Sequence, residues 1–227
     1  MNIFIISQYL EANGKGEDRL FKLGREMVSR GHAVTTLTSN GAVEMDLGRK
    51  RIGFFQKNGL NVIAFNVPYA NEMNNRQKVY ATLKFARMAE KQGKNLPKPD
   101  LIVVKSPPLT AGIAAIRLAA HYRVPVVAEF REIWPDALIK RGDLKGGLLI
   151  KALNSMEQKI YEKAGRIIAL NQGIADTIKA RFVERAKISV VEDEGDEQAL
   201  IAGYDKALRK MGLDKVTGPE KETDSEK

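Results

Sequence analysis

Residues 129–136 combine charged groups with an aromatic ring in a pattern suited to binding a polar ligand. They read EFREIWPD and follow an apolar run, so they would leave the carboxyl end of a strand. Arg131 offers a planar guanidinium that can hold a phosphate or carboxylate, and Trp134 offers a flat face for a sugar ring. Charged residues such as Glu129 and Glu132 are costly beside an apolar strand unless they bind a ligand or form an ion pair within the segment. We expect a ligand site here, and an ion pair between Arg131 and one of these glutamates is the alternative.

Ser106 and Pro107 follow another apolar run, DLIVVK. In open α/β sheets ligands bind outside the carboxyl ends of the strands, so both residues are candidate substrate-binding groups. The alternative is that Pro107 and Pro108 only begin the next helix.

Gly14, Lys15 and Gly16 lie in the turn that follows the first apolar run. Glycines let backbone amides approach a ligand, and the N-terminus of the following helix favours anions. The turn is neither a dinucleotide fingerprint, because Arg19 stands at the third glycine position, nor a phosphate-binding P-loop. The alternative is a flexible turn in which Asp18 caps the helix.

The composition excludes several classes of chemistry. The 227 residues contain no cysteine and two histidines, which excludes disulfides, iron–sulfur clusters, a cysteine nucleophile and a histidine-rich metal site, and we expect no metal. The net charge of +9 conceals a division, because residues 192–227 hold eleven acidic and six basic side chains and the preceding part carries +14. Such a basic body would attract phosphates or anionic lipid, although a solvated lysine-rich surface is the alternative. No nucleic-acid module is visible, so we expect no nucleic acid partner.

Apolar runs of strand length alternate with helical patterns along the chain. This alternation predicts an α/β fold, a doubly wound and mostly parallel sheet. A hairpin or a pair of short strands is expected around residues 57–59. The longer predicted helices are residues 75–92, residues 145–163 and a final amphipathic helix near residues 196–211. The N-terminus lacks a basic region before its apolar run, so we expect no signal peptide and a cytoplasmic location.

Three stretches of chain are expected to behave differently. Residues 1–191 carry the sheet, 192–212 form an acidic linker and a helix docked on the body, and 213–227 lack apolar anchors and should be disordered.

Several motifs occur together in the order typical of one enzyme family. They are, in chain order, SRGHAVTTLTS, KSPPLTAG, EFREIWPDA and IIALNQGI. On these motifs residues 1–191 resemble the N-terminal, Rossmann-like domain of GT-B glycosyltransferases, and more narrowly the family-four retaining enzymes of bacterial capsule, colanic-acid and O-antigen assembly.

The resemblance implies that this domain receives the acceptor, a glycan or a polyprenyl-linked sugar, with peripheral contact at the inner face of the membrane. It implies catalytic roles for Arg131 and Glu132, where Glu132 replaces the aspartate usual in relatives. It also implies that the loop of Gly14 and Gly16 faces the donor phosphates and the transferred sugar.

The chain departs from the family after Val191. Relatives continue into a second domain that binds the nucleotide sugar, whereas here EDEGDEQALIAG follows. No cofactor is therefore expected, and a nucleotide-sugar donor is expected only with a donor domain, supplied as a separate subunit. We expect little or no transfer by the chain alone. The alternatives are a non-catalytic module that binds a lipid-linked glycan or a partner protein, and an engineered stand-alone domain.

Overall fold

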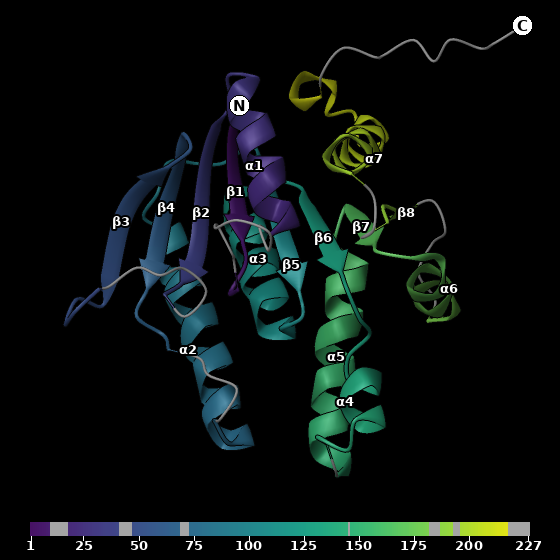
Figure 1. The fold of residues 1–227 in the computed structure, drawn as a ribbon. Helices are drawn as coiled ribbons and strands as arrows, with labels where there is room; N and C mark the ends of the chain where they lie inside the picture. Colours follow the sequence, from purple (N-terminus) through teal and green to yellow (C-terminus); the bar gives the residue numbers. More distant parts are fainter. Residues whose placement is uncertain are drawn as a thin grey trace, which may run out of the picture.

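In the computed structural model of the chain, eight strands form one sheet in the order β3-β4-β2-β1-β5-β6-β7-β8 (Figure 1). Every neighbouring pair is parallel except β3 and β4. The strands are β1 Asn2–Ile6, β2 Ala33–Ser39, β3 Ile52–Lys57, β4 Leu60–Phe65, β5 Leu101–Ser106, β6 Val126–Phe130, β7 Arg166–Ala169 and β8 Ile188–Val190. The helices are α1 Arg19–Ser29, α2 Asn75–Gly93, α3 Leu109–Tyr122, α4 Asp136–Lys140, α5 Gly147–Lys163, α6 Gln172–Ala180 and α7 Glu197–Arg209, followed by the 3₁₀ helix η3 Asp214–Val216. The structure describes residues 1–9, 18–40, 47–68, 73–144, 146–181, 187–192 and 196–217.

This architecture confirms the predicted doubly wound, mostly parallel sheet. The antiparallel pair β3–β4 is the expected hairpin, and it turns through Asn58 and Gly59, whose φ angles are 49° and 81°. Such left-handed conformations suit asparagine and glycine, which explains why this short sequence makes the turn.

Helices cover both faces of the sheet. One core lies beneath α2, α3 and α5 and includes Phe4, Phe85 and Phe130, while the other lies beneath α1 and α7 and includes Ile5, Phe21 and Tyr204. Successive residues of a strand point to opposite faces, so neighbours such as Glu129 and Phe130 enter different layers.

The C-terminal helix α7 docks on the body, as expected, and packs against α1. Its apolar stripe is buried against the sheet, and Tyr204 and Leu208 are at most 1% exposed. Polar contacts add to this packing, because Arg30 of α1 holds Asp205 through two hydrogen bonds of 2.7 and 3.1 Å. The acidic residues of this segment therefore match basic residues of α1.

Part of the stretch predicted to be disordered is folded. Residues 213–217 contain η3, and Val216 is fully buried against the core beneath α7. Val216 anchors this turn together with the partly buried Leu213, and two apolar residues are too short a signal for the sequence pattern to reveal. Residues 218–227 lie outside the described residues.

None of the helices in the described part of the chain combines the length and apolar character that crossing a membrane requires.

Candidate functional site

The carboxyl ends of three adjoining strands bring together Gln8, Ser106 and Arg131. Ser106 ends β5, Arg131 follows β6, and Gln8 lies two residues after β1, which pairs with β5. The backbone N–H of Arg131 donates to the Ser106 carbonyl oxygen at 3.3 Å. Ser106 and Gln8 are buried, Pro107 is half-buried, and Arg131 is exposed. The structure thus places Ser106, Pro107 and Arg131 at the carboxyl ends of β5 and β6, and their predicted roles in binding and catalysis stay predictions.

Two of these buried side chains lack hydrogen-bond partners. Neither amide atom of Gln8 nor the hydroxyl of Ser106 has a partner among the described residues, although the two side chains are 1% and 0% exposed. An unsatisfied buried polar group costs about 1–3 kcal/mol, so such groups call for a ligand or a water. Gln8 was missed in the sequence, where it follows the first apolar run without a distinguishing motif.

Glu132 is held within its own loop. Its Oε1 atom accepts from Trp134 Nε1 and its Oε2 atom from Arg141 Nη1, both at 2.8 Å. Trp134 is half-buried against the core beneath α3 and α5, which fixes the indole. Of the predicted catalytic pair, Glu132 therefore shapes the loop that presents Arg131.

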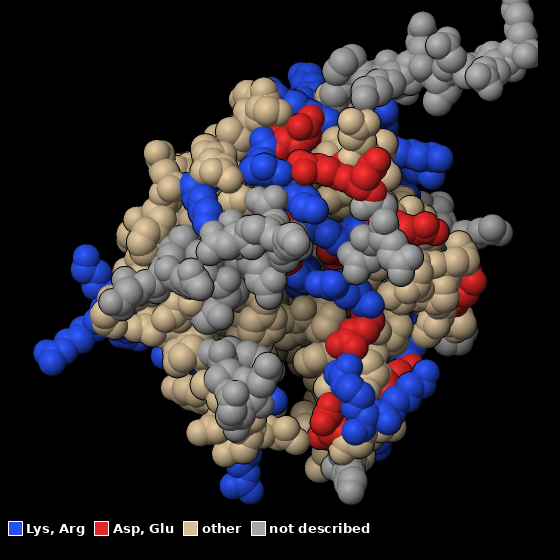
Figure 2. Space-filling view, in the orientation of Figure 1, with Lys and Arg blue, Asp and Glu red and all other residues tan. Residues whose placement is uncertain are grey.

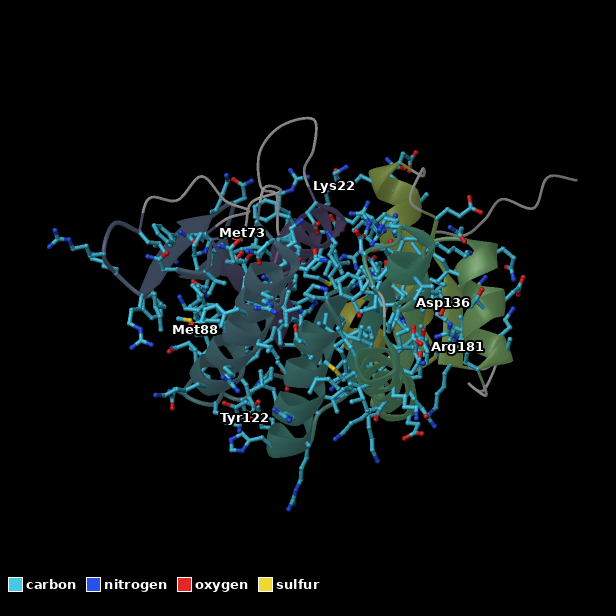
Figure 3. The ribbon with its side chains drawn as sticks, turned by 90° about the horizontal axis from the view of Figure 1, so that it is seen from below. Lys22, Met73, Met88, Tyr122, Asp136 and Arg181 are labelled. Atoms are coloured by element: carbon cyan, nitrogen blue, oxygen red, sulfur yellow. The ribbon has the colours of Figure 1, made fainter. Side chains whose placement is uncertain are left out.

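Asp136 extends this fixed loop to two helices. Arg181, which follows α6, forms ion pairs with both Asp136 and Glu157 of α5, and Figure 3 shows Asp136 and Arg181 close together. Glu157 also accepts from the Tyr161 hydroxyl at 2.8 Å, and burial raises the pKa of Glu157 against the opposing effect of its two donors. The loop after β6 is thus tied to α4, α5 and α6.

Glu129 faces away from this loop, into the layer of α1 and α7. Its Oε2 atom lies 3.4 Å from Arg19 Nε and accepts from the Tyr204 hydroxyl at 2.7 Å. Beside it, Lys105 forms an ion pair with Asp18, whose other oxygen caps α1 at the N–H of Leu20. Glu129 therefore connects β6 to α1 and α7, and its predicted role in substrate binding stays a prediction.

Arg19 joins this cluster to the end of the sheet. Its guanidinium donates to the Val191 carbonyl at 2.9 Å and also to the Glu192 carbonyl. Sequence reasoning missed Arg19 and Lys105. Lys105 was detectable, because a lysine within the run LIVVKS is as anomalous as a glutamate within VVAEF.

Burial raises the pKa of Glu129, and the Arg19 guanidinium and the Tyr204 hydroxyl oppose that shift only in part. The folded state therefore releases this proton at higher pH than the unfolded state. As pH rises above the ordinary glutamate pKa of 4.5, the contribution of Glu129 to the free energy of unfolding decreases.

We expect the Glu129→Gln variant to gain stability relative to the parent as pH rises from about 4.5 to 7, because glutamine has no proton to lose. Denaturant unfolding of both proteins across pH 3.5–7 measures this difference. Glu90→Gln is the matched control. Burial raises the pKa of Glu90, but Lys94 and Arg117 lower it by more, so that its pKa lies below the ordinary value of 4.5. The stability of Glu90→Gln relative to its parent should therefore change below about pH 4.5, and it should decrease rather than increase as pH rises. A flat difference for Glu129→Gln would contradict the assignment.

Gly14, Lys15 and Gly16 lie outside the described residues, so their predicted role stays a prediction. Among the described residues, no group of histidine and acidic side chains is arranged to hold a metal ion.

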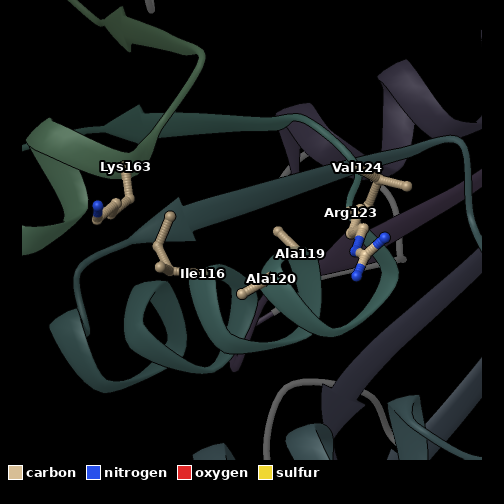
Figure 4. Close-up of a pocket in the computed structure, with 6 residues that line it drawn as sticks. All are labelled: Ile116, Ala119, Ala120, Arg123, Val124 and Lys163. Atoms are coloured by element: carbon tan, nitrogen blue, oxygen red, sulfur yellow. The ribbon is translucent and has the colours of Figure 1, made fainter.

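A separate depression of about 340 Å³ lies at the other end of α3 (Figure 4). Arg123 and Lys163 stand at its edges above Ile116 and Ala119. It lies near the amino ends of the strands, where α3 and α5 end, and is therefore distinct from the polar edge described above.

Comparison with solved structures shows the fold. A sucrose-phosphate synthase chain from Thermosynechococcus elongatus superposes with a TM-score of 0.63 at 13% identity, covering 93% of this chain and 99% of that one. Arabidopsis thaliana UGT89C1 complexed with UDP gives 0.53 at 12% identity, covering 85% of this chain and 52% of that one. UDP-GlcNAc 2-epimerase from Methanocaldococcus jannaschii gives 0.52 at 11% identity, covering 93% and 50%. The chain therefore spans about half the length of the latter two proteins, as one Rossmann-like half of a GT-B fold.

Comparison with curated proteins found no match by sequence. The model of one protein family does match, over residues 16–193, and this range includes α1, the sheet from β2 to β8, and the loop of Arg131. Together with the GT-B half fold, this match over most of the sequence shows that the chain belongs to the glycosyl transferase 4-like domain family.

Proposed function

We propose that the chain is the acceptor-binding half of a retaining glycosyltransferase, and that a separate domain must supply the nucleotide-sugar donor. The observation that carries this proposal is the pair of buried, unpartnered side chains at the carboxyl edge, Gln8 and Ser106. An amide and a hydroxyl can donate to and accept from sugar hydroxyls, and they lie beside the exposed Arg131.

In this proposal the chain's own residues bind and orient the acceptor. Arg131 contacts the acceptor, and Glu132, bonded to Trp134 and Arg141, holds the Arg131 loop in place. Stabilisation of the departing nucleotide diphosphate is left to the donor domain. Preorganised donors for such charge are worth roughly 100- to 1000-fold each in rate, so the chain alone should be a poor catalyst.

Exposed apolar side chains support a lipid-linked acceptor held at a membrane surface. Ile139, Leu148 and Leu149 are 43%, 86% and 47% exposed at the adjoining ends of α4 and α5. The exposed Lys140 and Lys151 are their neighbours in sequence. Apolar side chains with basic neighbours suit the boundary between anionic headgroups and acyl chains.

The test is a transfer assay with the purified chain, a nucleotide sugar, and two acceptors, a polyprenyl-linked sugar and the free oligosaccharide. We expect no turnover by the chain alone, and turnover when the donor-binding domain of a two-domain relative is added. The lipid-linked acceptor should be preferred. Arg131→Ala should reduce acceptor binding about tenfold or more, whereas Arg87→Ala, an exposed arginine of α2, should leave it unchanged.

Two results would overturn parts of this proposal. Rapid transfer without a second domain would show that the half is sufficient. Acceptor binding that no donor-binding domain converts into transfer would instead favour the second candidate, a non-catalytic module for lipid-linked glycans.

A further inference from the structure

The N-terminus of α3 opens on a hollow at the carboxyl edge of the sheet. In Figure 1, α2, α3 and α5 all begin at this edge, and Figure 2 shows the surface hollowed between α2 and the α4–α5 segment, below the start of α3. No side chain caps the first turn of α3, because its N-cap residue is Pro108.

Two backbone donors at this helix end lack acceptors. The N–H groups of Leu109 and Thr110 precede the first hydrogen bond of the turn, from the Ala111 N–H to the Pro108 carbonyl oxygen, and neither has an acceptor among the described residues. The first turn of α3 contains no acidic residue. The helix dipole therefore adds a partial positive charge that no acidic side chain of that turn offsets.

Two unpartnered side chains point independently to a ligand at the same place. Ser106 shares the orientation of Ile102 and Val104, whose side chains lie in the core beneath α3, so its hydroxyl faces the side of the sheet on which α3 begins. Gln8 lies near it, since Ile6 pairs with Val104, Ser106 lies two positions after Val104, and Gln8 lies two positions after Ile6, just beyond β1. Both are almost completely buried, and neither the hydroxyl of Ser106 nor the amide of Gln8 has a partner among the described residues.

All four groups can donate hydrogen bonds, and their charged surroundings favour an anion. The exposed Arg131 adjoins them through its hydrogen bond to Ser106. The nearest carboxylate in sequence, Glu132, has both oxygens bonded to donors of its own loop. A group that only accepts hydrogen bonds and carries negative charge satisfies this arrangement best.

We propose that this site binds an oxyanion, the carboxylate or phosphate of an acidic or phosphorylated acceptor sugar. The inference rests on the proposed function and narrows its acceptor to anionic sugars. Leu109 and Thr110 donate through the backbone, Ser106 and Gln8 donate through their side chains, and the N-terminus of α3 supplies a partial positive charge.

Titration of the ¹⁵N-labelled full chain with three probes, inorganic phosphate, glucuronate and glucose, tests the site by NMR. We expect the amide signals of Leu109 and Thr110 to shift with phosphate or glucuronate, and to remain unmoved by glucose at equal concentration. A response to phosphate alone identifies a phosphate site, and a response to glucuronate alone identifies a carboxylate site.

Substitutions then connect the signal to the side chains. Gln8→Glu and Ser106→Ala should each weaken oxyanion binding about tenfold or more, the first by repulsion and the second by loss of a donor. Thr36→Val is the matched control, because it removes another buried, unpartnered hydroxyl from β2, outside the site. Should Gln8→Glu fail to fold, Ser106→Ala carries the test.

Equal shifts with glucose, or no shift at Leu109 and Thr110 with either anion, would overturn the inference. Neither result affects the proposed acceptor function, which the transfer assay with the polyprenyl-linked sugar and the free oligosaccharide tests separately. Conversely, oxyanion binding in a chain that never supports transfer would leave the site standing and remove the function.

Discussion

Replacing Arg19 by methionine should lower the free energy of unfolding by about 3 kcal/mol. The substitution leaves Glu129 without its cation at 0% exposure, and it leaves the Val191 and Glu192 carbonyls without a donor. Removing one member of a buried ion pair costs about 3–5 kcal/mol, and protonation of Glu129, whose pKa is already raised, should keep the loss near the lower figure. Denaturant unfolding at pH 7 measures the change.

Arg117→Met is the control for this experiment. Arg117 pairs with Glu90 at 3.2 Å, but its side chain is 59% exposed, and exposed pairs contribute less than about 1 kcal/mol. Similar losses for both variants would show that the buried cluster does not fasten α7 and β8 to α1.

Phe130→Ala should be as damaging, by a different mechanism. Phe130 is fully buried beneath α3 and α5, and its ring centroid lies 4.9 Å from that of Tyr161. Truncating a buried phenylalanine typically costs about 3–5 kcal/mol, because apolar contacts are lost and a cavity remains. Since Phe130 immediately precedes Arg131, the substitution should also weaken acceptor binding.

Phe54→Ala provides the comparison, because Phe54 lies on the outermost strand and is 66% exposed. Its loss should change the free energy of unfolding by no more than about 0.5 kcal/mol. Thermal and denaturant unfolding of the two variants distinguish these cases, and a small effect of Phe130→Ala would mean that the loop of Arg131 is not supported from below.

The fold was accessible from the sequence because its signals are local and repeated. Apolar runs mark the strands, Asn58 and Gly59 mark the hairpin, and Asp18 caps α1 through the N–H of Leu20. Each of these signals depends on neighbours within a few residues, which is why the element boundaries agree closely with those expected.

The site was accessible only in part, because its partners come from distant segments. The strand-end rule located Ser106 and Arg131. It could not reveal that Glu129 bonds to Tyr204, 75 residues away, or to Arg19, 110 residues away. Nor could it reveal Arg141 as the partner of Glu132, because the short helix α4 that brings it there gave no recognisable pattern.

Two arginines of α1 attach the C-terminal part of the chain to the body. Arg19 binds the backbone at the end of the sheet, and Arg30 binds Asp205 of α7. Charged residues of α1 hold the segment that leaves the sheet at Val191 and also the helix that follows it. Figure 2 shows acidic and basic side chains interleaved on the upper part of the surface, where α1 and α7 lie in Figure 1.

This double attachment makes the half fold modular. The chain departs and returns on one side of the sheet, and both points are anchored independently, so a domain inserted between Glu192 and Asp196 would break neither anchor. A two-domain architecture and a single-domain one can thus share this half unchanged, and the joint between β8 and α7 is where a second domain can be gained, exchanged or lost.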